Sequence, residues 1–196
     1  MIPNAVPRLP GGPSALDRPV VLAAGRLLPV KGFDRLIRAF ALAAPDQPEW
    51  VLRICGSGEE QGALRALAAE LGLGGRMQLP GRVREIGGEL NGAAVFALSS
   101  RTEGLPLALL EAMSKGLAVV SFDCPTGPRE LIEHGVNGLL VPNGDEVAFG
   151  RALATLMEDE QLRRRLGAAA LRTAERYSLN AAAEHWAALV ARLTAG

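Results

Sequence analysis

The sequence predicts a single α/β domain with a doubly wound parallel sheet and a helical C-terminal tail. Three observations support this fold class. Short apolar runs alternate with stretches of helical periodicity, glycine-containing loops join them, and 196 residues suffice for one large domain. Strands that alternate with helices form βαβ units, in which helices cover both faces of the sheet. Ligands bind such sheets beyond the carboxyl ends of the strands, so functional residues are expected in the strand-to-helix loops.

The first 19 residues differ in composition from the rest of the chain. They contain five prolines and two glycines, and proline both fixes φ and removes a hydrogen-bond donor. Residues 1–19 are therefore predicted to form a linker or an extended arm, and neither a helix nor a central strand.

After this arm the chain alternates between strand-like and helix-like patterns. The runs VVLAAG and VLRICG are short and apolar and end in glycine, as expected of buried parallel strands. Phe33, Leu36 and Phe40 recur at helical spacing. The elements predicted in this half are strands at 20–25, 51–56 and near 76–80, and helices near 32–44, 59–72 and 84–91.

The second half continues the alternation. The run AAVFALS at 93–99 suits a central strand. Pro106 fits the first turn of a helix that runs to residue 115, where no N–H donor is required. The other elements predicted here are strands at 117–122 and 138–141, a short helix near 127–134, and helices near 145–157, 159–175 and 179–193.

Charge and cysteine content exclude several function classes. Lys+Arg and Asp+Glu number 21 each, and this zero net charge argues against nucleic-acid binding, which favours a basic excess. Cys55 and Cys124 lie far apart without a metal-binding pattern, so neither a metal site nor a disulfide is predicted. No apolar run reaches the roughly 18 residues of a membrane span, and no signal peptide opens the chain. These features predict a soluble, cytoplasmic protein.

The loop after the first predicted strand is a candidate anion site. Gly25 and Gly32 allow tight turns, Arg26 and Lys31 can converge on one anion, and a helix N-terminus follows. Together these features suit a diphosphate. The alternative is that both cations are ordinary solvated loop residues.

The loop after the second predicted strand is less specific. Gly56, Ser57 and Gly58 form a glycine turn before a helix, which a simple turn and helix cap explain equally well. The third glycine of the dinucleotide fingerprint is absent, which disfavours dehydrogenase chemistry.

The loop after the central strand carries two carboxylates. Glu103 lies in the loop, and Glu111 lies two turns into the following helix, about 10 Å away by helical rise. This spacing suits two carboxylates that bind hydroxyls at opposite ends of an elongated ligand. The alternative is two unrelated acidic residues, but Glu111 lies in the apolar run LPLALLEAM, where a carboxylate without partners is costly.

These residues give the sequence a resemblance to the retaining glycosyltransferases of family 4, which have the two-domain GT-B architecture. The resemblance covers residues 20–195, and the Glu-x7-Glu element from Glu103 to Glu111 is its most specific part. The matching segments are GRLLPVKG (25–32), RICGSGEE (53–60), LPGRV (79–83), ALSSRTEGLPLALLEAMSKGLAVVS (97–121) and HGVNGLLVPNGD (134–145).

The resemblance implies roles for individual residues. The implied catalytic residues are Arg26 and Lys31, which would bind the donor diphosphate and stabilise the leaving nucleotide, and Glu103, which would hold donor-sugar hydroxyls. Glu111 would bind the nucleotide ribose. The resemblance also implies a UDP-sugar donor, retention of configuration and no metal or other cofactor. The other implied donor-binding residues are Gly25, Gly56, Gly58, Arg82, Val83, Gly104, Leu105, Pro106 and Leu107.

The resemblance also implies a domain organisation. Residues 1–19 would be the interdomain linker, 20–178 the Rossmann-like nucleotide-sugar-binding domain, and 179–196 a C-terminal crossover helix. We therefore expect a missing N-terminal domain to bind the acceptor, and the isolated chain to be inactive. Peripheral association of an intact enzyme with the inner membrane stays open. Leu105 departs from the family, which commonly has phenylalanine there.

Two other functions remain open at this stage. A nucleotide-sugar epimerase of the same architecture would need further acid/base residues across the cleft, and the chain has only His134 and His185 as histidines. Alternatively, the isolated chain is a binding module that holds a nucleotide sugar without transferring it.

Overall fold

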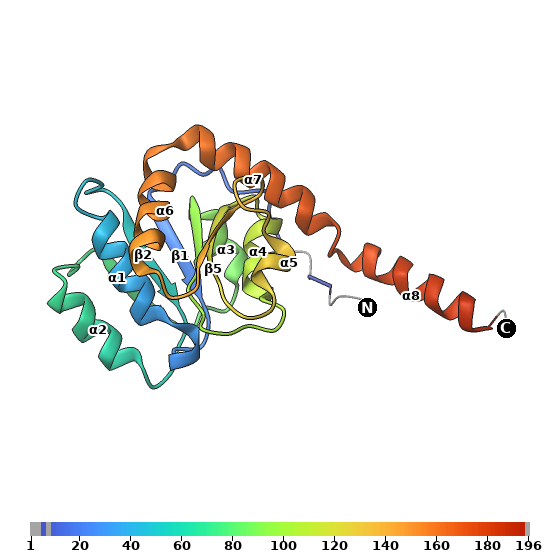
Figure 1. Cartoon of the computed structure of the whole chain (residues 1–196), viewed down its shortest axis with the longest axis horizontal. Helices are drawn as coiled ribbons and strands as arrows, with labels where there is room; N and C mark the ends of the chain where they lie inside the picture. Colours follow the sequence, from blue (N-terminus) through green and yellow to red (C-terminus); the bar gives the residue numbers. More distant parts are fainter. Residues whose placement is uncertain (1–4, 7–8, 195–196) are drawn as a thin grey trace.

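The computed structural model describes residues 5–6 and 9–194 of the chain. Its centre is a six-stranded sheet with the order β3-β2-β1-β4-β5-β6 (Figure 1). All neighbouring strands pair in parallel, as the alternation of strands and helices predicted. The strands are β1 (Val20–Ala24), β2 (Val51–Cys55), β3 (Met77–Gly81), β4 (Val95–Leu98), β5 (Ala118–Asp123) and β6 (Leu139–Pro142).

Helices cover both faces of this sheet. In Figure 1 the layer with α1, α2 and α6 lies on one side of the strands, and the layer with α3 and α4 lies on the other. The helices are α1 (Phe33–Ala43), α2 (Gln61–Glu70), α3 (Ile86–Asn91), α4 (Leu107–Ser114), α5 (Pro128–Leu131), α6 (Glu146–Glu158), α7 (Glu160–Glu175) and α8 (Leu179–Thr194).

The strand order places the functional loops. The chain builds outward from β1 to β3 and then returns to add β4, β5 and β6 on the other side of β1. The loops after β1 and β4 therefore leave the sheet in opposite directions and open a crevice between them, where doubly wound sheets bind ligands. All four residues of β4 and the first five of β5 are buried, because helices cover both of their faces.

The proline-rich N-terminal arm is held against the domain. Val6 is buried and pairs with Ser178 in a parallel bridge. Lys115 is only 2% exposed, and its ammonium donates to the backbone oxygens of Pro10, Gly11 and Gly12. These carbonyls replace the water lost on burial, and burial lowers the pKa of Lys115. The described residues between 9 and 19 form neither a helix nor a strand of the sheet, and a lysine that the sequence analysis did not single out anchors them.

The structure corrects three predicted boundaries. Pro29–Lys31 form a short 3-10 helix, η1, inside the predicted loop. Pro106 takes the N-cap position with ψ 85°, so α4 begins at Leu107. The predicted helix near 127–134 ends at Leu131, because the Asn137 side chain binds its carbonyl oxygen and turns the chain away.

Candidate functional site

A cavity of about 570 Å³ lies beyond the carboxyl ends of β1 and β2. It is bounded by the loops that follow these strands, by the β3–α3 connection and by the first turns of α4. Six of the predicted donor-site residues line it together, although they come from four separate stretches of sequence. These six are Gly25, Arg26, Gly56, Arg82, Val83 and Glu111, and the rest of the lining is Ala24, Cys55, Ser57, Ile86 and Ala108.

The glycines of the second loop allow it to pack against the first. A Cβ at Gly56 would lie 1.8 Å from the backbone oxygen of Gly25, and one at Gly58 would lie 2.3 Å from that of Leu27. The Leu27 N–H donates to the Ser57 oxygen at 2.9 Å, which ties the two loops together. Gly58 therefore supports the wall of the cavity from behind, and it is not among the lining residues.

Glu111 enters the cavity from α4, beside Ala108 one turn earlier. Its carboxylate has no hydrogen-bond or ion-pair partner among the described residues, and burial raises the pKa of Glu111 above its ordinary value. An acceptor group in a mostly apolar wall gains most from a ligand that donates hydrogen bonds to it. The arrangement therefore suits a hydroxyl-bearing ligand such as a ribose.

Cys55 is the other titratable group in the wall. It is 3% exposed, and burial raises the pKa of its thiol to about 11. A thiol of that pKa stays protonated near neutral pH, so Cys55 serves as a small apolar lining residue and not as a nucleophile.

Lys31 and Glu103 lie 72 positions apart in sequence and form an ion pair. The lysine Nζ donates to the Glu103 Oε1 at 2.6 Å, and the Ser100 hydroxyl donates to the same oxygen at 2.6 Å. Lys31 runs beside Gly25, because a Cβ at Gly25 would lie 3.7 Å from the lysine Cδ and Cε. The two predicted cations therefore have different surroundings: Arg26 lines the cavity, whereas Lys31 is not among its lining residues and pairs with Glu103.

Gly32 allows Lys31 and Glu103 to lie close enough to form this ion pair. It has φ +61°, and a Cβ there would lie 2.2 Å from the backbone oxygen of Ser99. Any other residue would push the β1–α1 loop away from the end of β4. The Ser99 hydroxyl also donates to the Lys31 backbone oxygen at 2.9 Å, which fixes the two loops side by side.

The segment after Glu103 lies next to the cavity without lining it. Gly104, Leu105, Pro106 and Leu107 are absent from the lining residues. The Thr126 hydroxyl donates to the backbone oxygen of Glu103, so the β5–α5 loop fixes this turn. No side chain caps the N-terminus of α4; the Leu109 N–H donates to the Pro106 oxygen at 3.0 Å, whereas those of Leu107 and Ala108 have no partner among the described residues.

Sequence reasoning missed the residues that hold these loops in place. Arg35 is buried, donates to the Ser99 oxygen at 2.9 Å and to the Asn143 Oδ1 at 3.1 Å, and stacks on Phe122 at 4.5 Å. It therefore joins the ends of β4 and β6 to α1. Arg101 pairs with Asp34 and lowers the pKa of that carboxyl against the opposing effect of burial. Basic residues beside apolar helix positions ordinarily indicate a solvated face, so no pattern in the sequence indicated these contacts.

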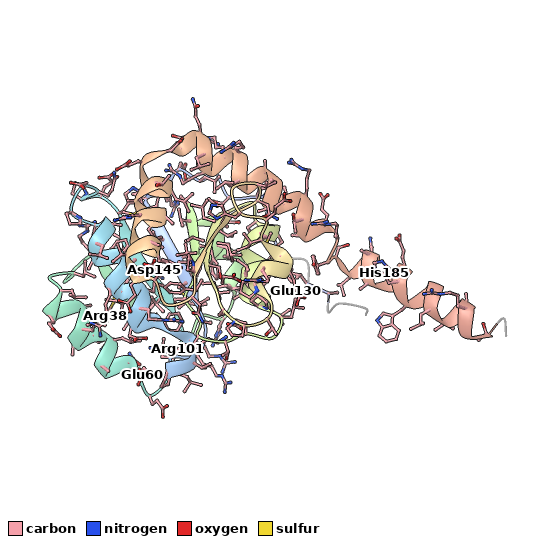
Figure 2. All side chains as sticks on the ribbon, viewed as in Figure 1. Arg38, Glu60, Arg101, Glu130, Asp145 and His185 are labelled. Carbon is pink, nitrogen blue, oxygen red and sulfur yellow. The ribbon has the colours of Figure 1, made fainter. Side chains whose placement is uncertain are left out.

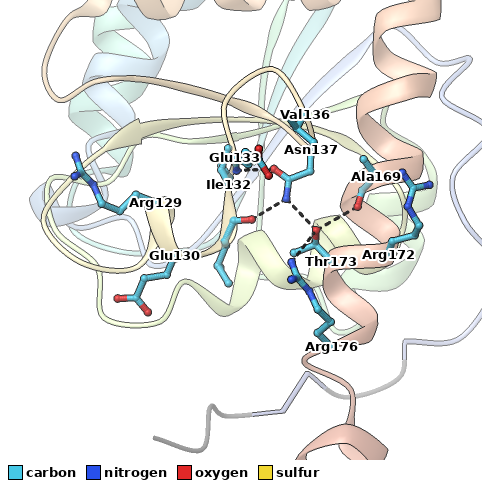
Figure 3. Close-up of a pocket in the computed structure, with 11 residues that line it drawn as sticks. Arg129, Glu130, Ile132, Glu133, Val136, Asn137, Ala169, Arg172, Thr173 and Arg176 are labelled. Atoms are coloured by element: carbon cyan, nitrogen blue, oxygen red, sulfur yellow. Dashed lines mark hydrogen bonds between the residues drawn. The ribbon is translucent and has the colours of Figure 1, made fainter.

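A larger cavity of about 640 Å³ lies elsewhere, between α5, the 132–137 loop and α7 (Figure 3). None of the predicted donor-site residues lines it. Its buried polar groups satisfy one another, because the Asn137 amide donates to the Leu131 oxygen and to the Thr173 hydroxyl, both at 2.9 Å. Its exposed arginines are Arg129 on α5, Arg172 in the last turn of α7 and Arg176 at the C-cap of that helix. The smaller cavity at the switch point is therefore the stronger candidate site.

The histidines lie away from the site. His185 is on α8, which projects from the body of the molecule (Figure 2). His134 accepts a hydrogen bond from the Leu140 N–H at 3.1 Å in the turn before β6. Among the described residues there is no group of three His, Cys, Asp or Glu side chains able to hold a metal ion. Nor does any described helix have the length and apolarity that crossing a membrane requires.

Comparisons with known proteins agree with this geometry. Residues 11–173 match the family model described as "Glycosyl transferases group 1". An exopolysaccharide phosphotransferase of Streptomyces coelicolor is 38% identical over 98% of this chain and 20% of its own length. An uncharacterised glycosyltransferase of Haemophilus influenzae is 32% identical over 87% of this chain and 48% of its own length.

A solved structure extends the comparison. The pneumococcal O-GlcNAc transferase GtfA, in complex with UDP and GlcNAc, matches 97% of this chain and 38% of its own with a TM-score of 0.85 and 28% identity. The chain thus spans about half or less of the length of these relatives. Fold and sequence together place it: the chain belongs to the group 1 glycosyl transferases and has the fold of their C-terminal GT-B domain.

Proposed function

We propose that this chain binds a nucleoside-diphosphate sugar, with a UDP-sugar as its donor, in the cavity at the switch point of the sheet. The observation that carries the proposal is the convergence of six predicted donor-site residues on that one cavity. The UDP and GlcNAc held by the pneumococcal relative support the choice of base.

Each charged group has a task in this proposal. Arg26 and Lys31 bind the diphosphate, together with the uncapped N–H groups of α4. Glu103 and the turn that follows it hold the sugar, and Glu111 accepts hydrogen bonds from the ribose. Arg82 and Val83 border the base. The two cations stabilise the negative charge that develops on the leaving diphosphate, and such preorganised stabilisation is a large part of many enzymatic rate enhancements.

We further propose transfer with retention of configuration, as in family 4, and a reaction that proceeds without a metal ion. The two cations would then do the work that a divalent ion does in other transferases. Donor binding should be unchanged when EDTA is added. We also propose a cytoplasmic location, which the buried free thiols of Cys55 and Cys124 favour.

The acceptor would be bound by a separate N-terminal domain. The relatives are at least about twice as long as the matched region, which leaves room for one. On α8, Leu179, Trp186 and Val190 are exposed at helical spacing, and an apolar stripe of this kind is typical of a surface that another domain covers. We propose that α8 crosses to the acceptor domain and that this chain alone is a donor-binding module.

Calorimetric titration of the chain with UDP, GDP and ADP, and then with UDP-glucose and UDP-GlcNAc, tests the donor proposal. Without added metal, UDP should bind more tightly than GDP or ADP. Lys31→Ala and Glu111→Ala should each weaken binding about tenfold or more, because each removes a charged contact to the nucleotide. Arg38→Ala, which removes an exposed cation from α1 (Figure 2), is the matched control and should bind normally.

The same titrations can refute the proposal. Unchanged affinity in both the Lys31 and the Glu111 variant would remove this cavity as the donor site. Absence of binding up to millimolar concentration for every nucleotide would remove donor binding as a function of the chain.

A further inference from the structure

The cation expected to bind the donor diphosphate is already paired within the protein. Lys31 donates to the Glu103 Oε1 at 2.6 Å, and the Glu103 side chain is only 9% exposed. The Ser100 hydroxyl holds the same carboxylate oxygen at 2.6 Å. A carboxylate of this chain therefore stands beside the ammonium that a phosphate would approach.

The backbone around this pair is fixed, whereas the lysine side chain has room to move. Ser99 and Thr126 hold the backbone oxygens of Lys31 and Glu103, respectively. The Lys31 side chain is 27% exposed, and its stem runs beside Gly25, which lines the donor cavity. Rotation about its four-carbon stem can therefore move the ammonium from Glu103 toward a phosphate in the cavity.

Glu103 also keeps a free acceptor. Both of its side-chain hydrogen bonds end on Oε1, and Oε2 accepts none from the described part of the chain. Ionised carboxylates accept hydrogen bonds and donate none. Sugar hydroxyls can therefore use Oε2, whereas phosphate oxygens, which are also acceptors, cannot.

We propose that Glu103 makes the site prefer the sugar donor over the diphosphate product, an inference that rests on the function proposed above. A phosphate bound to Lys31 lies close to the Glu103 carboxylate, and the two like charges repel. Sugar hydroxyls that donate to Glu103 offset this repulsion. A diphosphate without a sugar meets the repulsion and lacks the hydroxyls. Glu103 thus binds the donor and, once the sugar has left, promotes release of the diphosphate.

Glu103→Gln tests this inference because it keeps the shape of the side chain and removes its charge. We expect the variant to bind UDP roughly fivefold tighter than the wild type, the size expected for loss of one partly exposed like-charge contact. Affinity for UDP-glucose and UDP-GlcNAc should stay the same or fall, so the preference for the sugar conjugate over UDP decreases.

Glu158→Gln is the matched control, because it removes one negative charge from an exposed position at the end of α6. It should leave both affinities unchanged. Melting curves establish that each variant is folded, and Glu103→Ala is the second variant, with the same direction expected.

The outcomes separate the two proposals. If Glu103→Gln and Glu103→Ala bind UDP no tighter than the wild type, while Lys31→Ala still loses UDP, this inference is overturned and the donor site stands. If neither the wild type nor any variant binds a nucleoside diphosphate or its sugar conjugates, the proposed function falls and this inference falls with it.

Discussion

Two carboxylates at the candidate site have opposite surroundings. Glu103 receives an ammonium and a hydroxyl on one oxygen, whereas Glu111 has no partner among the described residues and has a raised pKa through burial. A carboxylate that is partly buried without partners weakens the fold, because the charged form has lost part of its water. Residues that reduce stability in this way are common at binding sites, where the ligand supplies the missing partner.

Glu111→Gln is therefore expected to stabilise the fold at pH 7 while it weakens nucleotide binding. The folded pKa of Glu111 lies above its unfolded value of 4.5, so the ionised group costs stability above the folded pKa. As the pH falls through the folded pKa, protonation removes this cost, and it is absent below 4.5. Because the group is partly exposed, the gain at pH 7 should stay under about 1 kcal/mol.

Urea unfolding of the wild type and of Glu111→Gln at pH 7 and pH 4 measures this difference. Glu130→Gln, an exposed position on α5, is the control and should change stability at neither pH. A gain for Glu111→Gln of the same size at both pH values would show that ionisation is not its cause.

At the scale of elements, close backbone contacts decide how the strand-to-helix loops fit together. The loops after β1, β2 and β4 touch through glycines, with Gly32 against Ser99 and Gly56 against Gly25. These contacts bring the 3-10 turn that ends at Lys31 against the end of β4. The position of the lysine therefore depends on the absence of a side chain at its neighbour.

Gly32→Ala should accordingly damage both stability and binding. A positive φ alone costs a non-glycine residue about 1–2 kcal/mol, and the Cβ would also overlap the Ser99 oxygen at 2.2 Å. Gly72→Ala is the matched control, because Gly72 has φ +70° with nothing within 4 Å of the added Cβ. Urea unfolding should give a clearly larger loss for Gly32→Ala, and only that variant should lose UDP affinity. Equal losses in the two variants would mean that the contact with Ser99 does not matter.

Much of the fold was predictable from local pattern. Apolar runs such as 93–99 and periodic stretches such as 145–157 gave the strands, the helices and the parallel sheet, because burial on both faces leaves a continuous apolar run. Contacts between distant residues were not predictable. Glu103 pairs with Lys31 across 72 positions, and no local pattern indicated that Lys115 is buried against the N-terminal arm.

The candidate site, like the fold, could be predicted only in part. The residue types and loops could be predicted, since glycines, cations and carboxylates after parallel strands share one edge of the sheet. The sequence could not show which of these residues line the same cavity, nor that Lys31 forms an ion pair with Glu103. Arg35 escaped prediction because its three partners come from separate elements, the ends of β4, β5 and β6.

The whole molecule has a body and a projecting helix. The described side chains of α8 are all at least partly exposed, and the helix extends away from the sheet (Figure 1). The arm and α8 meet at the bridge between Val6 and Ser178, so both ends of the domain leave it at one place. The acceptor domain proposed above would then lie on that side of the molecule.

Under the proposed function, we expect the 196-residue chain to bind the donor without transferring the sugar. Glycosyl transfer needs an acceptor held against the donor sugar and a site closed to water, and the open switch-point cavity provides neither. UDP release from UDP-glucose or UDP-GlcNAc by the chain should therefore stay at background. A fusion with the N-terminal half of the Haemophilus influenzae relative before residue 1 should release UDP, and Lys31→Ala in that fusion should abolish the release. Sustained turnover by the chain alone would mean that it carries its own acceptor site.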